Sequence, residues 1–103
     1  MSIFISVEDP EGEPLIEVFE IERLFKKFPT ASGHCLRYIS EQVDSSFNAL
    51  QTPVLLAELQ ALSATALAAD ERGELDRLLK VCGKHAGKKN EYIRFYGEAK
   101  SEE

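Results

Sequence analysis

The first residues of the chain alternate between apolar and polar or aromatic side chains, a pattern typical of a β-strand over Ser2–Val7. Because successive side chains of a strand point to opposite faces, the isoleucines share one face and Phe4 lies on the other. The turn-forming segment Glu8–Gly12 follows, and the run Leu15–Ile21 is again rich in branched and aromatic residues. Together these segments predict a β-hairpin with a long loop.

The next apolar residues recur at helical spacing. Between Ile21 and Phe28 they stand three or four positions apart, which predicts a short amphipathic helix that ends before Pro29. The segment His34–Ile39 predicts a third short strand. The polar segment Ser40–Gln51 is expected to be irregular.

Two longer helices are predicted in the second half of the chain. Thr52-Pro53 is a favourable helix start, and a stripe of leucines carries this first helix to about Ala69. Asp70 can cap a second helix, whose apolar stripe includes Cys82 and ends near Gly87. Both segments are rich in strong helix formers.

The final predicted strand is Glu91–Gly97, with Ile93 and Phe95 on one face. The predicted order of elements is β-β-α-β-α-α-β. The simplest packing is an α+β fold, a small antiparallel sheet with the helices on one face. No linker or repeat divides the chain, so we expect a single domain over residues 1–97 and a flexible acidic tail over residues 98–103.

Acidic and basic residues are concentrated in separate segments of the chain, which the net charge alone does not show. Lys and Arg number 12 against 18 Asp and Glu, which gives a formal net charge of −6. The segment Met1–Glu22 carries seven acids and no base, whereas Arg23–Ile39 and Lys80–Gly97 are net basic. An acidic chain repels nucleic acid and attracts basic protein surfaces. We therefore expect a protein partner or self-association in preference to nucleic acid.

Three further sequence features indicate the cellular compartment of the protein. No apolar run approaches the roughly 20 residues that span a bilayer. The first residues show neither the basic region nor the cleavage site of a secretory signal. The two cysteines stand far apart and do not form a disulfide framework. These features predict a cytoplasmic protein that makes no membrane contact.

The cysteines and histidines are the residues best suited to metal or nucleophilic chemistry. His34, Cys35, Cys82 and His85 match the ligand inventory of tetrahedral zinc, but their spacing fits no common zinc module. A cysteine nucleophile needs a nearby group that stabilises its thiolate, and the sequence around either cysteine provides none. A small Cys/His metal protein is therefore the least favoured alternative function, and we predict no metal, no cofactor and no enzymatic activity. Whether the four residues meet in space stays open.

A glycine- and lysine-rich segment covers residues 83–89. It lacks the spacing and the hydroxyl residue of a phosphate-binding loop, and it ends a helix where such a loop would begin one. Lysines followed by aromatics can still hold a nucleic-acid backbone and stack a base. The alternative function is therefore a phosphate- or RNA-binding domain that uses the basic helix end and the last strand. Its residues would be Lys84, Lys88, Lys89, Tyr92, Arg94 and Tyr96.

The last strand carries the most informative surface. Tyr92, Arg94 and Tyr96 share one of its faces, and tyrosine and arginine are enriched at the centres of protein interfaces. If helices cover only the other face of the sheet, Phe4 and Tyr38 extend this interaction surface. Our first hypothesis is a non-enzymatic acidic protein–protein interaction module. Its sharpest form is an immunity-type inhibitor of a basic toxin or enzyme, and homodimerisation is the other route to covering such a surface.

One resemblance accompanies these patterns. The residues Phe47-Asn48, Gln51 and Pro53, followed by Leu55-Leu56 and Glu58-Leu59, lead to the closing run Tyr92-Ile93-Arg94-Phe95-Tyr96-Gly97. This arrangement resembles a loose group of small bacterial proteins with no assigned activity. The resemblance covers nearly the whole chain and implies no functional residue.

Overall fold

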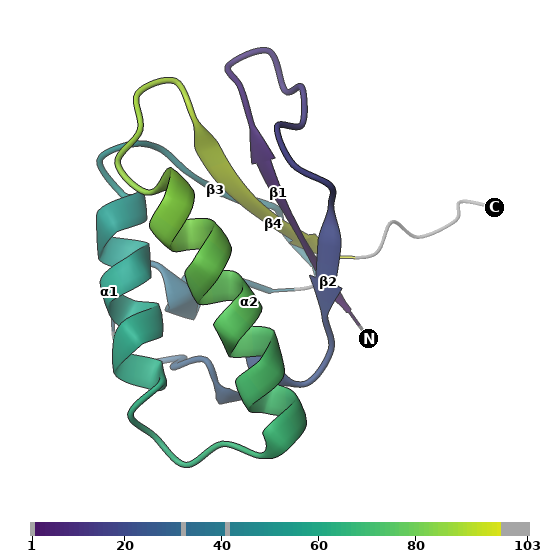
Figure 1. The fold of residues 1–103 in the computed structure, drawn as a ribbon, viewed down its shortest axis with the longest axis vertical. Coiled ribbons are helices and arrows are strands. Elements are labelled where there is room, and N and C mark those ends of the chain that lie inside the picture. The colour runs from purple at the N-terminus through teal and green to yellow at the C-terminus, as the bar shows by residue number, and fades with distance from the viewer. Residues whose placement is uncertain (1, 32, 41, 98–103) are drawn as a thin grey trace, which may run out of the picture.

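A computed structural model describes residues 2–31, 33–40 and 42–97 and shows two layers (Figure 1). One layer is a four-stranded antiparallel sheet, and the other contains two α-helices. The predicted α+β fold, with an antiparallel sheet and helices on one face, is confirmed. The predicted acidic tail over residues 98–103 lies outside the described residues.

The two ends of the described chain form the centre of the sheet. Strand order is β2-β1-β4-β3, and β1 (Ile3–Glu8) pairs with β4 (Tyr92–Gly97) over its full length. The edge strands are shorter, namely β2 (Phe19–Ile21) and β3 (Ser45–Phe47). The sheet therefore depends on a contact between residues that are far apart in sequence.

The two helices pack against each other and on the sheet. They are α1 (Thr52–Leu62) and α2 (Ala69–His85). The predicted second helix is present as α2, but it begins at Ala69, so Asp70 lies in its first turn and the prediction that Asp70 caps it is wrong. Gly87 adopts a positive φ of 75° two residues beyond its end. The prediction that α1 continues to Ala69 is wrong.

The early end of α1 has a local cause and a distant one. The Ser63 and Thr65 hydroxyls donate to main-chain carbonyls three residues earlier, at 2.7 Å each. Arg72 of α2 then donates from Nη1 to the Ser63 carbonyl at 2.8 Å. These bonds satisfy carbonyls that a continuing helix would need for its own ladder, so the chain turns here.

Four predictions in the first half of the chain differ from the structure. The segment His34–Ile39 is not a strand but contains a single 3-10 turn, η2 (Leu36–Tyr38). The third strand is instead β3, inside the segment predicted to be irregular. Likewise, only Phe19–Ile21 of the predicted strand Leu15–Ile21 pairs with β1 as a strand. The predicted helix before Pro29 is one 3-10 turn, η1 (Leu24–Lys27).

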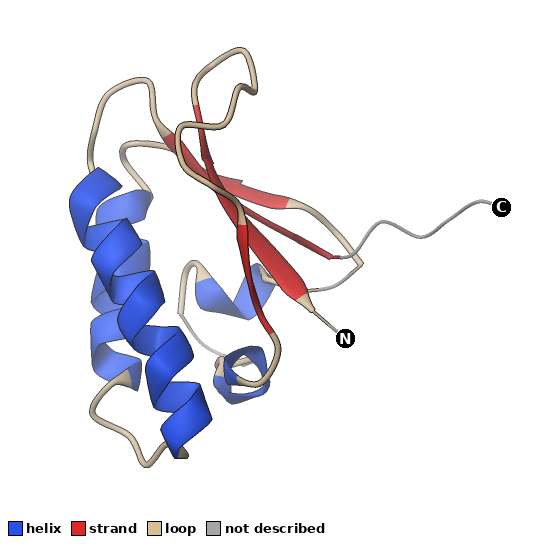
Figure 2. Cartoon of the chain, turned by 45° about the vertical axis from the view of Figure 1, so that its right-hand side comes forward, coloured by secondary structure: helices blue, strands red, loops and turns tan. Residues whose placement is uncertain are grey.

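The core lies between the sheet and the helices. Figure 2 shows the described helices and 3-10 turns on one side of the sheet. Alternate residues of β1 and β4 face this core, where they meet the leucines of both helices. The opposite face of the sheet is free of helices in the described chain. The fully buried core residues include Ile3, Ile5, Val7, Leu24, Leu36, Leu55, Leu59, Leu75, Leu78, Cys82, Ile93 and Phe95.

Candidate protein interaction surface

An aromatic and arginine cluster lies on the helix-free face of the sheet. Phe4 of β1 is directly opposite Tyr96 of β4. Their rings stack with centroids 5.6 Å apart and an interplanar angle of 28°. The guanidinium carbon of Arg94 lies 4.3 Å from the centroid of the Tyr96 ring, within the range of a cation–π contact. The three side chains therefore form one packed group, which we call the open-face cluster.

Two carboxylates fix the position of Arg94. Its Nη1 donates to Glu8 Oε2 at 3.2 Å, and its Nη2 donates to Asp44 Oδ2 at 2.5 Å. The hydrogen bond to Asp44 is the largest cause of a raised pKa for Arg94, with Glu8 adding to it and partial burial opposing it. The guanidinium is thus permanently charged and held over Tyr96 by groups from β1 and from the segment before β3.

The other two aromatic residues of the predicted surface differ in position. Tyr92 lies opposite Glu8 in the register and, two residues before Arg94, shares its face. Tyr38 lies outside the sheet strands, in η2, where its side chain is 57% exposed. The structure therefore brings Phe4, Tyr92, Arg94 and Tyr96 onto one sheet face and places Tyr38 beyond its strands.

The sequence patterns did not indicate which residues surround Arg94 on this face. Glu8 and Asp44 were visible only as acidic residues of turns, and nothing in the sequence indicates that they hold Arg94. Ser6 pairs with Arg94 across the strands and is 1% exposed. Its Oγ has no hydrogen-bond partner among the described residues. The register of β1 against β4 creates these contacts, and the sequence alone does not define that register.

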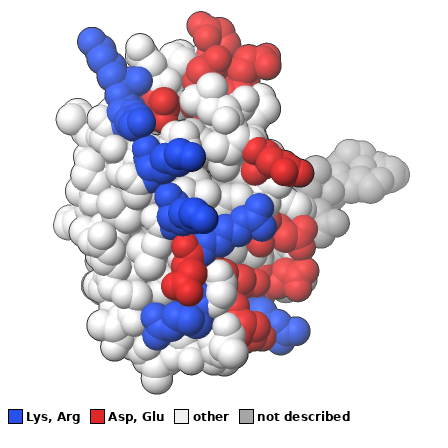
Figure 3. Space-filling view, viewed as in Figure 1, with Lys and Arg blue, Asp and Glu red and all other residues white. Residues whose placement is uncertain are grey.

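The lysines of the alternative function do not form one surface with the tyrosines. Lys84 is an exposed residue of α2, which covers the opposite face of the sheet from Tyr92 and Tyr96. Lys88 and Lys89 are exposed in the connection between α2 and β4. Figure 3 shows basic side chains in a band that follows α2, on the helical side of the molecule.

Both cysteines are buried, His34 lies in a loop, and His85 is the last residue of α2. Burial raises the pKa of Cys35 to about 11, with a smaller contribution from Glu58, and burial raises the pKa of Cys82 to about 12. His85 Nδ1 lies 2.7 Å from a Glu91 carboxylate oxygen. Residue His34 is exposed. Within residues 2–31, 33–40 and 42–97, no three His, Cys, Asp or Glu side chains are grouped to hold a metal ion.

Comparisons with known proteins identify no relative: no family model, no curated protein and no solved structure matches the chain. None of the described helices is long and apolar enough to span a membrane. The geometry of the sheet face therefore carries the functional argument.

Proposed function

We propose that the protein is a non-enzymatic binding module that docks a basic protein partner on the helix-free face of its sheet. The observation that carries this proposal is the open-face cluster of Phe4, Arg94 and Tyr96. Aromatic and arginine side chains provide most of the binding energy at typical interfaces. Here they are already packed together, so a partner immobilises few additional rotamers on binding.

The charges around the cluster define the chemistry of the partner. Glu8 and Asp44 offset the charge of Arg94, and Glu20 lies opposite Phe4 on the other neighbouring strand. The chain as a whole carries −6. A basic protein surface would be steered toward this face and matched by its carboxylates. An immunity-type inhibitor that covers the basic cleft of a toxin or enzyme is the specific form of this proposal.

A phosphate- or RNA-binding function has less support. It requires Lys84 and the tyrosines of β4 to grip the same ligand, yet α2 and the tyrosines lie on opposite sides of the sheet. The carboxylates beside Arg94 also repel a phosphate backbone from the aromatic face.

Capture from the native cell lysate tests the proposal when two matched variants accompany the wild-type protein. The double variant Phe4→Ala, Tyr96→Ala removes the stacked rings. Tyr38→Ala removes an aromatic ring outside the sheet strands. We expect a basic protein to be retained at one-to-one stoichiometry by wild type and Tyr38→Ala. The double variant should bind that protein at least about 30-fold more weakly, as for the loss of a hot spot.

Two results would contradict the proposed function. One is equal retention of the partner by the double variant and by wild type. The other is capture of an acidic protein or a nucleic acid as the stoichiometric partner. Thermal unfolding of each variant must accompany the binding data, because a variant that loses its fold would also lose its partner.

A further inference from the structure

A second charged surface lies away from the open-face cluster, on α2. Arg77, Lys80 and Lys84 follow the spacing i, i+3, i+7 and are all exposed, so they lie along one side of the helix. Lys88 follows in the next connection and is also exposed. We call these four residues the basic band, and Figure 3 shows basic side chains along α2.

The basic band has no carboxylate partner within the part of the chain that the structure describes. Other cations do have one: Arg23 pairs with Asp70 at 3.2 Å, and Lys27 with Glu71 at 4.0 Å. The exposed Asp76 lies four residues before Lys80 and is the acid of α2 nearest to the band. The four cations outnumber it, so the surface remains positive. Such a surface attracts an acidic group from outside the subunit.

An acidic band runs beside the basic one. It consists of three exposed glutamates in the connection between β1 and β2, which are Glu11, Glu13 and Glu17. Figure 3 shows acidic side chains next to the row of basic ones on the same face of the molecule.

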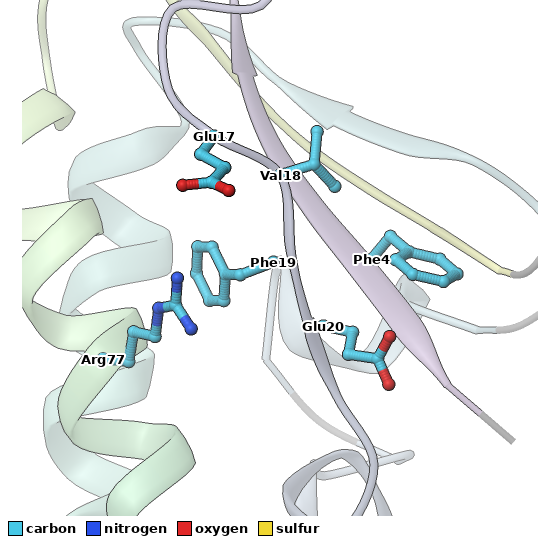
Figure 4. Close-up of a pocket in the computed structure, with 6 residues that line it drawn as sticks. All are labelled: Phe4, Glu17, Val18, Phe19, Glu20 and Arg77. Carbon is cyan, nitrogen blue, oxygen red and sulfur yellow. The ribbon is translucent and has the colours of Figure 1, made fainter.

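A pocket of about 390 Å³ separates the two bands. In the close-up of Figure 4, Glu17 and Arg77 lie on the same side of β2, with Phe19 between them. The Arg77 guanidinium carbon is 4.4 Å from the centroid of the Phe19 ring. Three other residues that line the pocket, Phe4, Val18 and Glu20, lie on the other side of β2, toward the helix-free face of the sheet. Arg77 of the basic band and Glu17 of the acidic band therefore border the same depression, with the Phe19 ring between them.

Neighbouring bands of opposite sign do not suit a polyanion. At physiological salt, charges interact over about 8–10 Å. A nucleic acid that bound along α2 would lie within reach of the glutamates and be repelled by them. A partner with the same two bands in the reverse order fits better, and a second copy of this chain provides one.

We infer that the protein forms a twofold homodimer through the face that carries α2 and β2. With the twofold axis running between the bands, parallel to them, the basic band of each copy meets the acidic band of the other. Both contacts form at once, as in any isologous interface. An axis perpendicular to the sheet would pair β2 with its copy edge to edge, but it would set like charges against each other. The contacts that define the dimer come from α2 and from the connection between β1 and β2, not from Arg94 or Tyr96, so the dimer does not rest on the proposed function.

Charge reversal in two separate variants tests this geometry. Lys80→Glu, Lys84→Glu makes the basic band acidic, and Glu13→Lys, Glu17→Lys makes the acidic band basic. By sedimentation in about 50 mM salt, where such pairs are weakly screened, wild type should be a dimer. Each variant alone should raise the dissociation constant of the dimer by about 100-fold or more, since like charges then face each other twice. An equimolar mixture of the two variants should associate again, because both contacts are then between opposite charges.

The control is Lys26→Glu, Arg37→Glu, which makes the same change in net charge as Lys80→Glu, Lys84→Glu but at exposed residues outside both bands. It should remain a dimer. A monomeric wild type up to about 500 µM, where even weak dimers with millimolar-range constants are detectable, would overturn the inference. So would a mixture of variants that does not associate. A third result would also overturn it. If monomeric wild type binds a labelled single-stranded RNA and the variant Lys80→Glu, Lys84→Glu does not, the partner of the basic band is a polyanion and not a second copy of the chain.

Discussion

At the scale of single residues, two glutamates organise the irregular half of the molecule. Glu74 of α2 accepts the backbone N–H groups of residues 22, 23 and 24 at 2.8–3.1 Å. Glu58 of α1 accepts those of residues 34, 35 and 36 at 2.6–3.2 Å. Each carboxylate thereby caps the chain that enters a 3-10 turn. The partners stand more than 20 residues apart, so no local sequence pattern reveals them.

The first residue-scale prediction concerns Glu58. Burial raises its pKa, but the three N–H donors at Leu36, His34 and Cys35 lower it more, so the pKa lies below its ordinary value. Glu58→Gln should lower the free energy of unfolding by about 1–3 kcal/mol at pH 7. A depressed carboxyl pKa stabilises the fold above its unfolded value, and this contribution is lost as pH falls through the folded pKa.

Urea unfolding at pH 7 and at about pH 3 checks this prediction, since carboxyl groups titrate between these values. The gap between wild type and Glu58→Gln should shrink at the lower pH. Glu11→Gln is the matched control, because the Glu11 carboxylate accepts no hydrogen bond among the described residues. A gap that stays constant with pH would show that the charge of Glu58 is not what stabilises the fold.

A second residue-scale prediction concerns the thiols. Burial holds the pKa of Cys35 near 11 and that of Cys82 near 12, and both are free cysteines in the core. Only a thiolate reacts readily, so both residues should label at least about 100-fold more slowly than a free thiol at pH 8. Labelling with a thiol-specific chromophore before and after addition of guanidinium measures this difference. Rapid labelling of one cysteine in the native protein would reopen the hypothesis of a cysteine nucleophile.

At the scale of elements, helices and strands with a regular hydrophobic pattern were predicted well, and short elements without such a pattern were missed. The strands β1 and β4 and the helix α2 were predicted with nearly correct bounds, because each buries one regular face. The short strand β3 and the turn η2 were missed. The strand has three residues, and the turn depends on the Glu58 carboxylate from another element. Distant hydrogen bonds therefore decided the elements that local patterns could not.

Replacing glycine by alanine should change the free energy of unfolding in opposite directions at different positions of the fold. Gly73 and Gly83 lie inside α2, and a Cβ added at either would meet no atom within 4 Å. Alanine at each should raise the free energy of unfolding by about 0.5–1 kcal/mol. Gly33 has a φ of 97°, and its added Cβ would approach a Glu58 carboxylate oxygen to 3.2 Å. Gly33→Ala should therefore destabilise the fold by about 1–3 kcal/mol.

Thermal and urea unfolding of the three single variants measures these changes. The contrast between Gly33→Ala and the two helix variants is the decisive comparison, since the substitution is chemically the same in each. Equal effects of the same sign at all three positions would contradict the backbone conformations described here.

At the scale of the whole molecule, the patterns predicted the layers but not their surfaces. They correctly indicated which face of β4 enters the core, and they selected Phe4, Arg94 and Tyr96 as candidates. They could not place the carboxylates that hold Arg94, because Glu8 and Asp44 reach it from different elements. They also did not indicate that the acidic connection lies beside the basic side of α2. Both features depend on strand order, which the sequence does not encode locally.

The last prediction separates stability from binding with two neighbouring residues of β4. Phe95 is fully buried in the core, whereas Tyr96 is half-buried in the open-face cluster. Phe95→Ala should cost about 3–5 kcal/mol, which is comparable to the total stability of a small domain. Tyr96→Ala should cost far less, because solvent can fill the site of the lost ring, yet it should weaken capture of the partner. Unfolding and capture measured on the same two proteins test both faces of the strand. If Tyr96→Ala proved as destabilising as Phe95→Ala, its ring would belong to the core, and the sheet face would lose its role as a binding surface.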